Sequence, residues 1–176
     1  MGLDTVELIM EFENHFNIHF KDEEIQKISR VGEVSNLICQ MINIHSENKD
    51  EFDSLYVSFQ NYFGNNIQLN DKISNYLEVN NYKDLSDYLN LKVKNYSNIL
   101  KYVFLDHHFI KWKELTVEEF INGILIRNCK HLFDNNSPKT IYQVYLIVGN
   151  IILDRIDCPV YDIQSYASIT KDLRID

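Results

Sequence analysis

The residues with the clearest capacity for chemistry are two adjacent histidines in Asp106-His107-His108. Neighbouring side chains on a helix point about 100° apart, so the two imidazoles are poorly placed to share one metal ion. No other His or Glu stands three or four residues away to complete a metal-binding pair. We therefore expect structural or surface roles for both histidines. An enzyme that uses the pair is the alternative.

The three cysteines, Cys39, Cys129 and Cys158, are far apart and form no CxxC pair. This excludes the usual spacing of a zinc site and gives no disulfide framework. They lie in apolar helical contexts or at a helix end, so buried, inert thiols are favoured over nucleophiles. Neither a Ser-His-Asp arrangement nor a phosphate-binding loop is present. The sequence predicts a protein without catalytic residues, metal or cofactor, which is not an enzyme.

Composition points to a folded, acidic protein. The 176 residues include 17 Lys and Arg against 26 Asp and Glu, for a net charge of −9. Nucleic-acid binding requires clustered cations, so an acidic chain is a poor candidate for it and fits a basic protein surface better. Neither a secretory signal nor an apolar run of membrane-spanning length is found, and we expect a cytoplasmic protein without membrane contact.

Apolar residues at helical spacing predict an all-α fold. Five Gly and two Pro among 176 residues agree with helices joined by modest loops. The expected helices cover residues 3–16, 22–28, 31–44, 52–63, 82–93, 116–128 and 140–156. The apolar series of the first helix consists of Leu3, Val6, Leu8, Ile9, Phe12 and Phe16.

Two parts of the chain carry the same pattern. The helix expected from Phe52 matches the helix expected from Ile141 at five apolar positions. Each is followed by a loop that ends in a similar hexapeptide, Lys72-Ile-Ser-Asn-Tyr-Leu77 or Ser168-Ile-Thr-Lys-Asp-Leu173. Residues 31–38 match residues 117–124. The common order predicts a diverged internal repeat. A single bundle of six amphipathic helices is the alternative.

Residues 2–38 contain a more specific motif. Leu3-Asp4-Thr5-Val6-Glu7-Leu8, followed by Asp22-Glu-Glu-Ile and Val31-Gly-Glu-Val, closely resembles the second to fourth helices of acyl carrier proteins. The resemblance implies a small helical bundle that meets partner enzymes through its acidic second helix.

The attachment position of that family is altered in this chain. The family's serine precedes the Leu-Asp of the motif, where this chain has Gly2. Glycine has no hydroxyl and cannot form the phosphodiester to phosphopantetheine. Ser86, in Tyr82-Lys83-Asp84-Leu85-Ser86, is the alternative hydroxyl, although its context differs from the family motif.

The family's first helix and the loop after it resemble residues 140–176 rather than a segment before Gly2. We therefore expect a circularly permuted carrier-like bundle of residues 1–45 and 140–176, with a second, degenerate bundle at 46–139. Gly2 and Asp176 should then lie close together, within one chain or between the chains of a swapped homodimer.

The acidic residues of the motif region form the expected partner site. The resemblance places Asp4, Glu7, Glu11, Glu13 and Asp22 on the surface that meets basic patches, although a row of acids on a helix is also typical of a solvated face. We expect a non-catalytic carrier-like protein that binds a partner's basic surface. A genuine acyl or phosphopantetheine carrier with a non-standard serine is the alternative.

Overall fold

The computed structural model describes residues 3–77, 82–92, 114–133, 137–156, 158–171 and 173. The histidine pair, Gly2 and Asp176 lie outside these residues, so the predictions made for them stay predictions. Within the described ranges the regular structure is helical, with two isolated β-bridges and no strand. The predicted all-α fold is confirmed. No helix in these ranges is long and apolar enough to cross a membrane.

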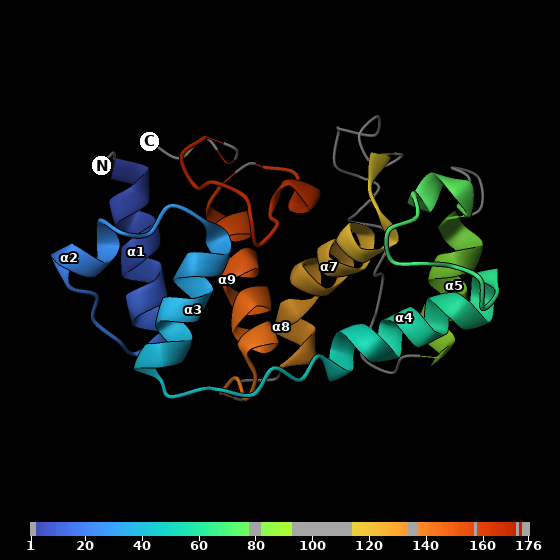
Figure 1. The fold of residues 1–176 in the computed structure, drawn as a ribbon, viewed down its shortest axis with the longest axis horizontal. Helices are drawn as coiled ribbons and strands as arrows, with labels where there is room; N and C mark the ends of the chain where they lie inside the picture. Colours follow the sequence, from blue (N-terminus) through green and yellow to red (C-terminus); the bar gives the residue numbers. More distant parts are fainter. Residues whose placement is uncertain are drawn as a thin grey trace. The chain divides into compact units, whose positions relative to one another are not determined.

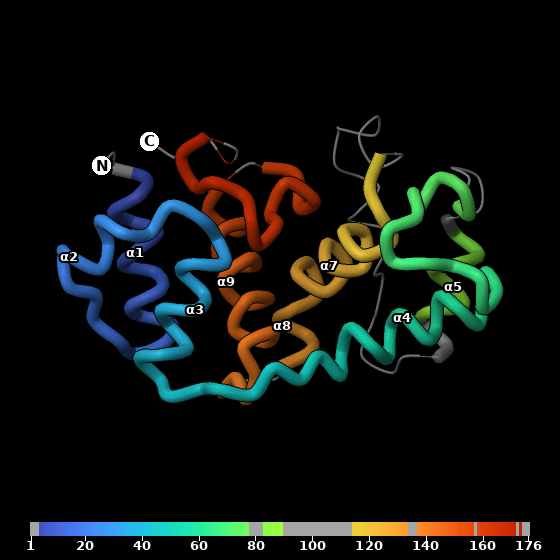
Figure 2. Tube along the Cα trace, viewed as in Figure 1, coloured from blue at the N-terminus to red at the C-terminus, as the bar shows by residue number. Residues whose placement is uncertain are grey.

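The chain divides into two compact units (Figure 1). Unit 1 combines residues 1–48 with residues 136–176, and unit 2 comprises residues 49–135. The chain therefore leaves unit 1 after residue 48, forms unit 2, and returns to unit 1 at residue 136. The continuous colour gradient of Figure 2 shows this path: blue and red segments together form unit 1.

Unit 1 is built around the packing of α9 (Ile141–Arg155) on α1 (Leu3–Phe16) and on α3 (Val31–Met41). The short α2 (Asp22–Ile25) connects α1 to α3, and η4 (Val160–Asp162) follows α9. Asn17 adopts a left-handed conformation, with φ 52°, and ends α1 as predicted. The side chains that form the core are fully or almost fully buried: Leu8, Phe12, Val34, Ile38, Val144, Val148 and Ile152.

Unit 2 places α4 (Asp50–Phe63) against α5 (Tyr82–Lys92) and α7 (Val117–Arg127). The segment between α4 and α5 contains η1 (Ile73–Asn75), and α8 (Cys129–Leu132) follows α7. Gly64 ends α4 with a φ of 105°, a conformation that L side chains rarely adopt. The buried side chains of this core include Phe52, Leu55, Phe59, Leu85, Leu89, Phe120 and Ile124.

The predicted repeat has a counterpart in the backbone hydrogen bonds. In each unit a return segment, residues 160–171 in unit 1 and 64–77 in unit 2, forms one antiparallel bridge with the residue before a helix. Arg30 pairs with Ser168, and Lys72 pairs with Thr116. These are the positions that the sequence comparison had made equivalent.

Three further backbone bonds repeat on either side of these bridges. In unit 1 they run from the N–H of Ile169 to Ser29 O (2.9 Å), Val31 to Ala167 O (3.1 Å) and Gly32 to Ser165 O (2.8 Å). In unit 2 they run from the N–H of Ile73 to Leu115 O (2.9 Å), Val117 to Asp71 O (2.9 Å) and Glu118 to Leu69 O (3.0 Å). Agreement at every one of these positions goes beyond what two unrelated amphipathic helices would share.

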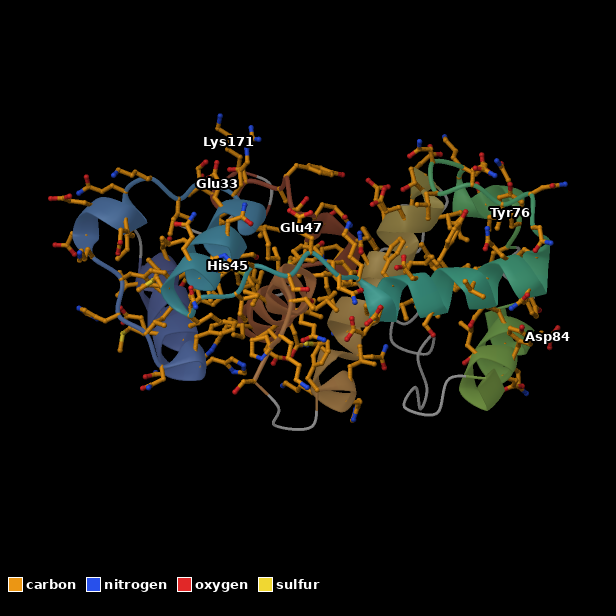
Figure 3. The ribbon with its side chains drawn as sticks, turned by 60° about the horizontal axis from the view of Figure 1, so that its bottom comes forward. Glu33, His45, Glu47, Tyr76, Asp84 and Lys171 are labelled. Atoms are coloured by element: carbon orange, nitrogen blue, oxygen red, sulfur yellow. The ribbon has the colours of Figure 1, made fainter. Side chains whose placement is uncertain are left out.

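A glutamate caps the helix that each return segment meets. Glu33 Oε2 accepts hydrogen bonds from the backbone N–H groups of Ser29 (2.8 Å) and Arg30 (3.0 Å). These bonds hold the pKa of Glu33 below its ordinary value, with the Ser29 N–H as the largest cause. Glu119 Oε2 accepts from Thr116 N (2.9 Å) in the same way. Figure 3 shows Glu33 at the start of α3.

A tyrosine ties the first helix of each repeat to its return segment. Tyr145 of α9 donates from its hydroxyl to Ile163 O at 3.1 Å. Tyr56 of α4 donates to Ile67 O at 2.8 Å. Both isoleucines are fully buried, so each carbonyl depends on an internal partner.

We predict that Tyr145→Phe lowers the free energy of unfolding by about 1 kcal/mol, because the ring is retained while a buried carbonyl loses its donor. Tyr56→Phe should act in the same direction in unit 2. Urea unfolding followed by circular dichroism measures both effects. Tyr88→Phe is the matched control, because its hydroxyl makes no hydrogen bond with the described residues. An equal loss in all three variants would contradict the role of the two hydroxyls.

Candidate docking site on helix α1

Helix α1 presents a buried face and an exposed apolar face. Leu8 and Phe12 are 2% and 1% exposed and contribute to the core of unit 1. Val6 and Met10 are 43% and 54% exposed, and their four-residue spacing places them on one side of the helix. They are two of the most exposed large apolar side chains among the described residues.

The apolar series predicted for this helix includes Val6 together with Leu8 and Phe12. The structure separates them, because Val6 is exposed while Leu8 and Phe12 are buried on the helix that packs against α9. Met10 was not identified from the sequence at all. Its four-residue spacing from Val6 could have identified it, because the two residues form an apolar pair on the side of the helix away from Leu8 and Phe12. That side of an amphipathic helix usually carries polar residues.

Acidic side chains lie on the same helix as this apolar pair. Asp4 and Glu7 are exposed, and neither forms an ion pair with a described residue. Glu7 lies one turn before Met10, at i, i+3, so its carboxylate is next to that side chain, and Asp4 lies in the first turn of the helix. Apolar area beside carboxylates is a surface suited to a partner that carries apolar and cationic side chains together.

Two of the five predicted partner residues are engaged within unit 1. Glu11 forms an ion pair with Arg155 of α9. Glu13 Oε1 accepts a hydrogen bond from the backbone N–H of Phe20 (2.8 Å) and contacts His19 Nδ1 (2.9 Å). Both carboxylates therefore stabilise the bundle, and changing them would alter unit 1 itself.

A further group of acidic residues lies on α2. Asp22, the fifth predicted residue, is exposed in the first turn of this short helix, next to the exposed Glu23. Glu24 caps the helix by accepting from the Lys21 N–H at 2.8 Å. Asp4, Glu7 and Asp22 are thus the exposed members of the predicted set. Unit 1 contains seven basic and fourteen acidic residues, so most of the net charge of −9 lies in this unit.

The other candidate residues lie elsewhere. Ser86 is half-buried in the second turn of α5, directly after the buried Leu85. Cys39 and Cys129 are buried, and burial raises the pKa of the Cys39 thiol, which disfavours a reactive thiolate. Across the described ranges, no three His, Cys, Asp or Glu residues are grouped closely enough to hold a metal ion.

Comparison with known proteins supports the predicted resemblance. The chain is 58% identical over 39 residues to an acyl carrier protein of Chloroherpeton thalassium, which is 22% of this chain and 49% of that protein. It is 50% identical over 39 residues to an acyl carrier protein of Picosynechococcus, covering 22% of this chain and 48% of the relative. A third, from Clostridium acetobutylicum, is 56% identical over 37 residues, or 21% and 48% of the two chains.

The extent of these matches is limited. The chain spans about half the length of the curated relatives that it matches. No family model and no solved structure matches it. Similarity of 50–58% over about 39 residues nevertheless exceeds what shared helix composition would produce. The resemblance is confirmed: the chain is acyl-carrier-protein-like over about a fifth of its length, within an all-α fold.

Proposed function

We propose that this protein is a non-catalytic, carrier-like module that binds a partner protein through α1 of unit 1. The observation that carries the proposal is the exposed pair Val6 and Met10, with the exposed Glu7 next to Met10, on a helix that belongs to a carrier-like motif. Glu11 and Glu13, which the sequence also predicts to meet the partner, are engaged by Arg155 and by the backbone of Phe20, so the first test uses Asp4 and Glu7.

Simple energetics suit a transient complex. Covering the exposed parts of Val6 and Met10 contributes about 1 kcal/mol each. Exposed ion pairs typically add less than about 1 kcal/mol each and weaken with salt. The acidic field of unit 1 accelerates encounter with a basic surface, so binding is fast, weak and salt-sensitive.

The proposal includes a carrier-like bundle whose parts are circularly permuted. Unit 2 supports it, because its elements follow one another in the order α4, return segment, α5 and α7. Unit 1 contains the matching elements, but α9 and its return segment come after α1 and α3 in the sequence. Moving residues 136–176 in front of residue 1 would give both units the same order.

A chain with this order, residues 136–176 followed by a short Gly-Ser link and residues 1–135, should therefore fold. We expect its free energy of unfolding to remain within about 1 kcal/mol of the natural chain, because all packed elements are kept. Urea unfolding and mass by light scattering test this. Loss of cooperative unfolding would contradict the permutation. A natural chain that is dimeric while the reordered chain is monomeric would identify a swapped dimer.

The docking proposal predicts that Asp4→Lys/Glu7→Lys abolishes co-purification of partner proteins, because it reverses the exposed acidic charge of α1, including the carboxylate next to Met10. Glu47→Lys/Asp53→Lys is the matched control, with the same change in net charge at two exposed positions. Glu47, labelled in Figure 3, lies on the segment before α4, and Asp53 lies on α4 itself. We expect the control to retain its partners. Equal retention or equal loss in both variants would contradict docking through α1.

The absence of a hydroxyl at Gly2 predicts that the protein does not accept phosphopantetheine at that position. Incubation with coenzyme A and a phosphopantetheinyl transferase, followed by intact mass measurement, tests this, with a standard acyl carrier protein as positive control. An unchanged mass is expected. A stoichiometric increment that disappears in Ser86→Ala would instead establish the alternative, a genuine carrier that uses Ser86.

A further inference from the structure

The two repeats differ at the positions that form the docking face. The buried pair Leu85 and Leu89 of α5 has the same spacing as Leu8 and Phe12 of α1. Moreover, α5 packs on α4 as α1 packs on α9, and these two supporting helices are equivalent in the repeat. The buried pairs therefore fix the register between α1 and α5.

In this register the exposed apolar pair of α1 is replaced by two charges in α5. Lys83 stands two residues before Leu85, as Val6 stands two residues before Leu8. Asp87 stands two residues after Leu85, as Met10 stands two residues after Leu8. Both side chains are exposed.

One acid of the docking face is conserved between the two copies. Asp84 of α5, labelled in Figure 3, is exposed at the position of Glu7. The two helices thus share a carboxylate and differ in the apolar contact beside it. The helices also differ in charge, since the position of Asp4 is Asn81 in the second copy. A difference in binding between them should therefore follow from these replacements, of which Lys83 and Asp87 take the place of the apolar pair.

Lys83 and Asp87 make α5 unfavourable for the partner that α1 would bind. An apolar partner side chain placed over Lys83 or Asp87 would desolvate a charge without pairing it. A partner cation near Lys83 would also meet a like charge, which is a common means of rejecting an otherwise similar surface. The second copy keeps the fold of the repeat while its surface excludes the partner of the first copy.

We infer that the chain binds one partner through α1 alone, and that Lys83 and Asp87 exclude the same partner from α5. The partner surface carries two apolar side chains about one helical turn apart, flanked by Lys or Arg. Unit 2 then does not bind this partner, and the chain is monovalent for it. This inference rests on the proposed docking function and adds its stoichiometry and its specificity.

The test uses the full chain, labelled with ¹⁵N, and a synthetic helix-forming peptide with two leucines four residues apart, flanked by arginines. Amide shifts of α1 and α5 are followed during titration. For the natural chain we expect saturating shifts on α1 only, and one peptide bound per chain. The shifts on α5 should stay below saturation at about ten times the concentration that half-saturates α1.

Two variants test whether Lys83 and Asp87 are what prevents peptide binding at α5. Lys83→Val/Asp87→Met should create a second set of saturating shifts on α5 and two bound peptides. Lys83→Asp/Asp87→Lys, which keeps both charges at the same exposed positions, should not. The amide spectrum of each free variant shows whether the fold is retained.

The outcomes separate this inference from the proposed function. Saturating shifts on both helices of the natural chain would overturn the inference and leave docking through α1 intact. Failure of Lys83→Val/Asp87→Met to create a second site in a folded chain would also overturn it. Absence of binding at α1 would overturn the docking proposal, and the inference with it.

Discussion

The packing of α9 on α1 and α3 is the contact on which unit 1 depends. Residues 1–48 alone have two helices whose apolar faces would be exposed to water, and a core of that size is marginal even when complete. Val144, Val148 and Ile152 cover those faces, and each fully buried side chain of this kind contributes about 1.5–3 kcal/mol. Because α9 lies at the far end of the sequence, the chain must pass through all of unit 2 before unit 1 is closed.

The return segment, residues 160–171, fixes its own position along the start of α3 through backbone hydrogen bonds. The two backbones are so close that a Cβ at Gly32 would lie 2.8 Å from the carbonyl oxygen of Ser165. Unit 2 makes the same bonds at the start of α7 with Glu118 at the equivalent position. The pattern of backbone hydrogen bonds is therefore shared by the two copies while side chains have diverged, which is the expected result when the bonded groups are main-chain atoms. The approach at Gly32 is closer than Glu118, which has a Cβ, could make.

The two copies diverge in different ways in the core and on the surface. Equivalent core positions exchange one apolar side chain for another, as Phe59 and Val148 do. On the surface an exposed apolar pair of α1 is replaced by Lys83 and Asp87 in α5. Exposed substitutions of this kind have small effects on stability, typically within about 0.5 kcal/mol, so the surface of one copy can change while both cores are maintained. The asymmetry between the units is thus compatible with a shared fold and gives them different capacities for binding.

The sequence by itself determined the all-α class, nearly all described helix positions and the equivalence of the two repeats, because these follow from local periodicity and matching order. It also identified the carrier-like motif, since that signal lies in consecutive residues. Only the tertiary structure decided which acids are available. Glu11 is paired by Arg155 from a distant helix, and Glu13 binds the backbone of Phe20 across a loop. It likewise separated exposed Val6 and Met10 from buried Leu8 and Phe12, because helical spacing defines a face but the packed partner decides how much of it is covered.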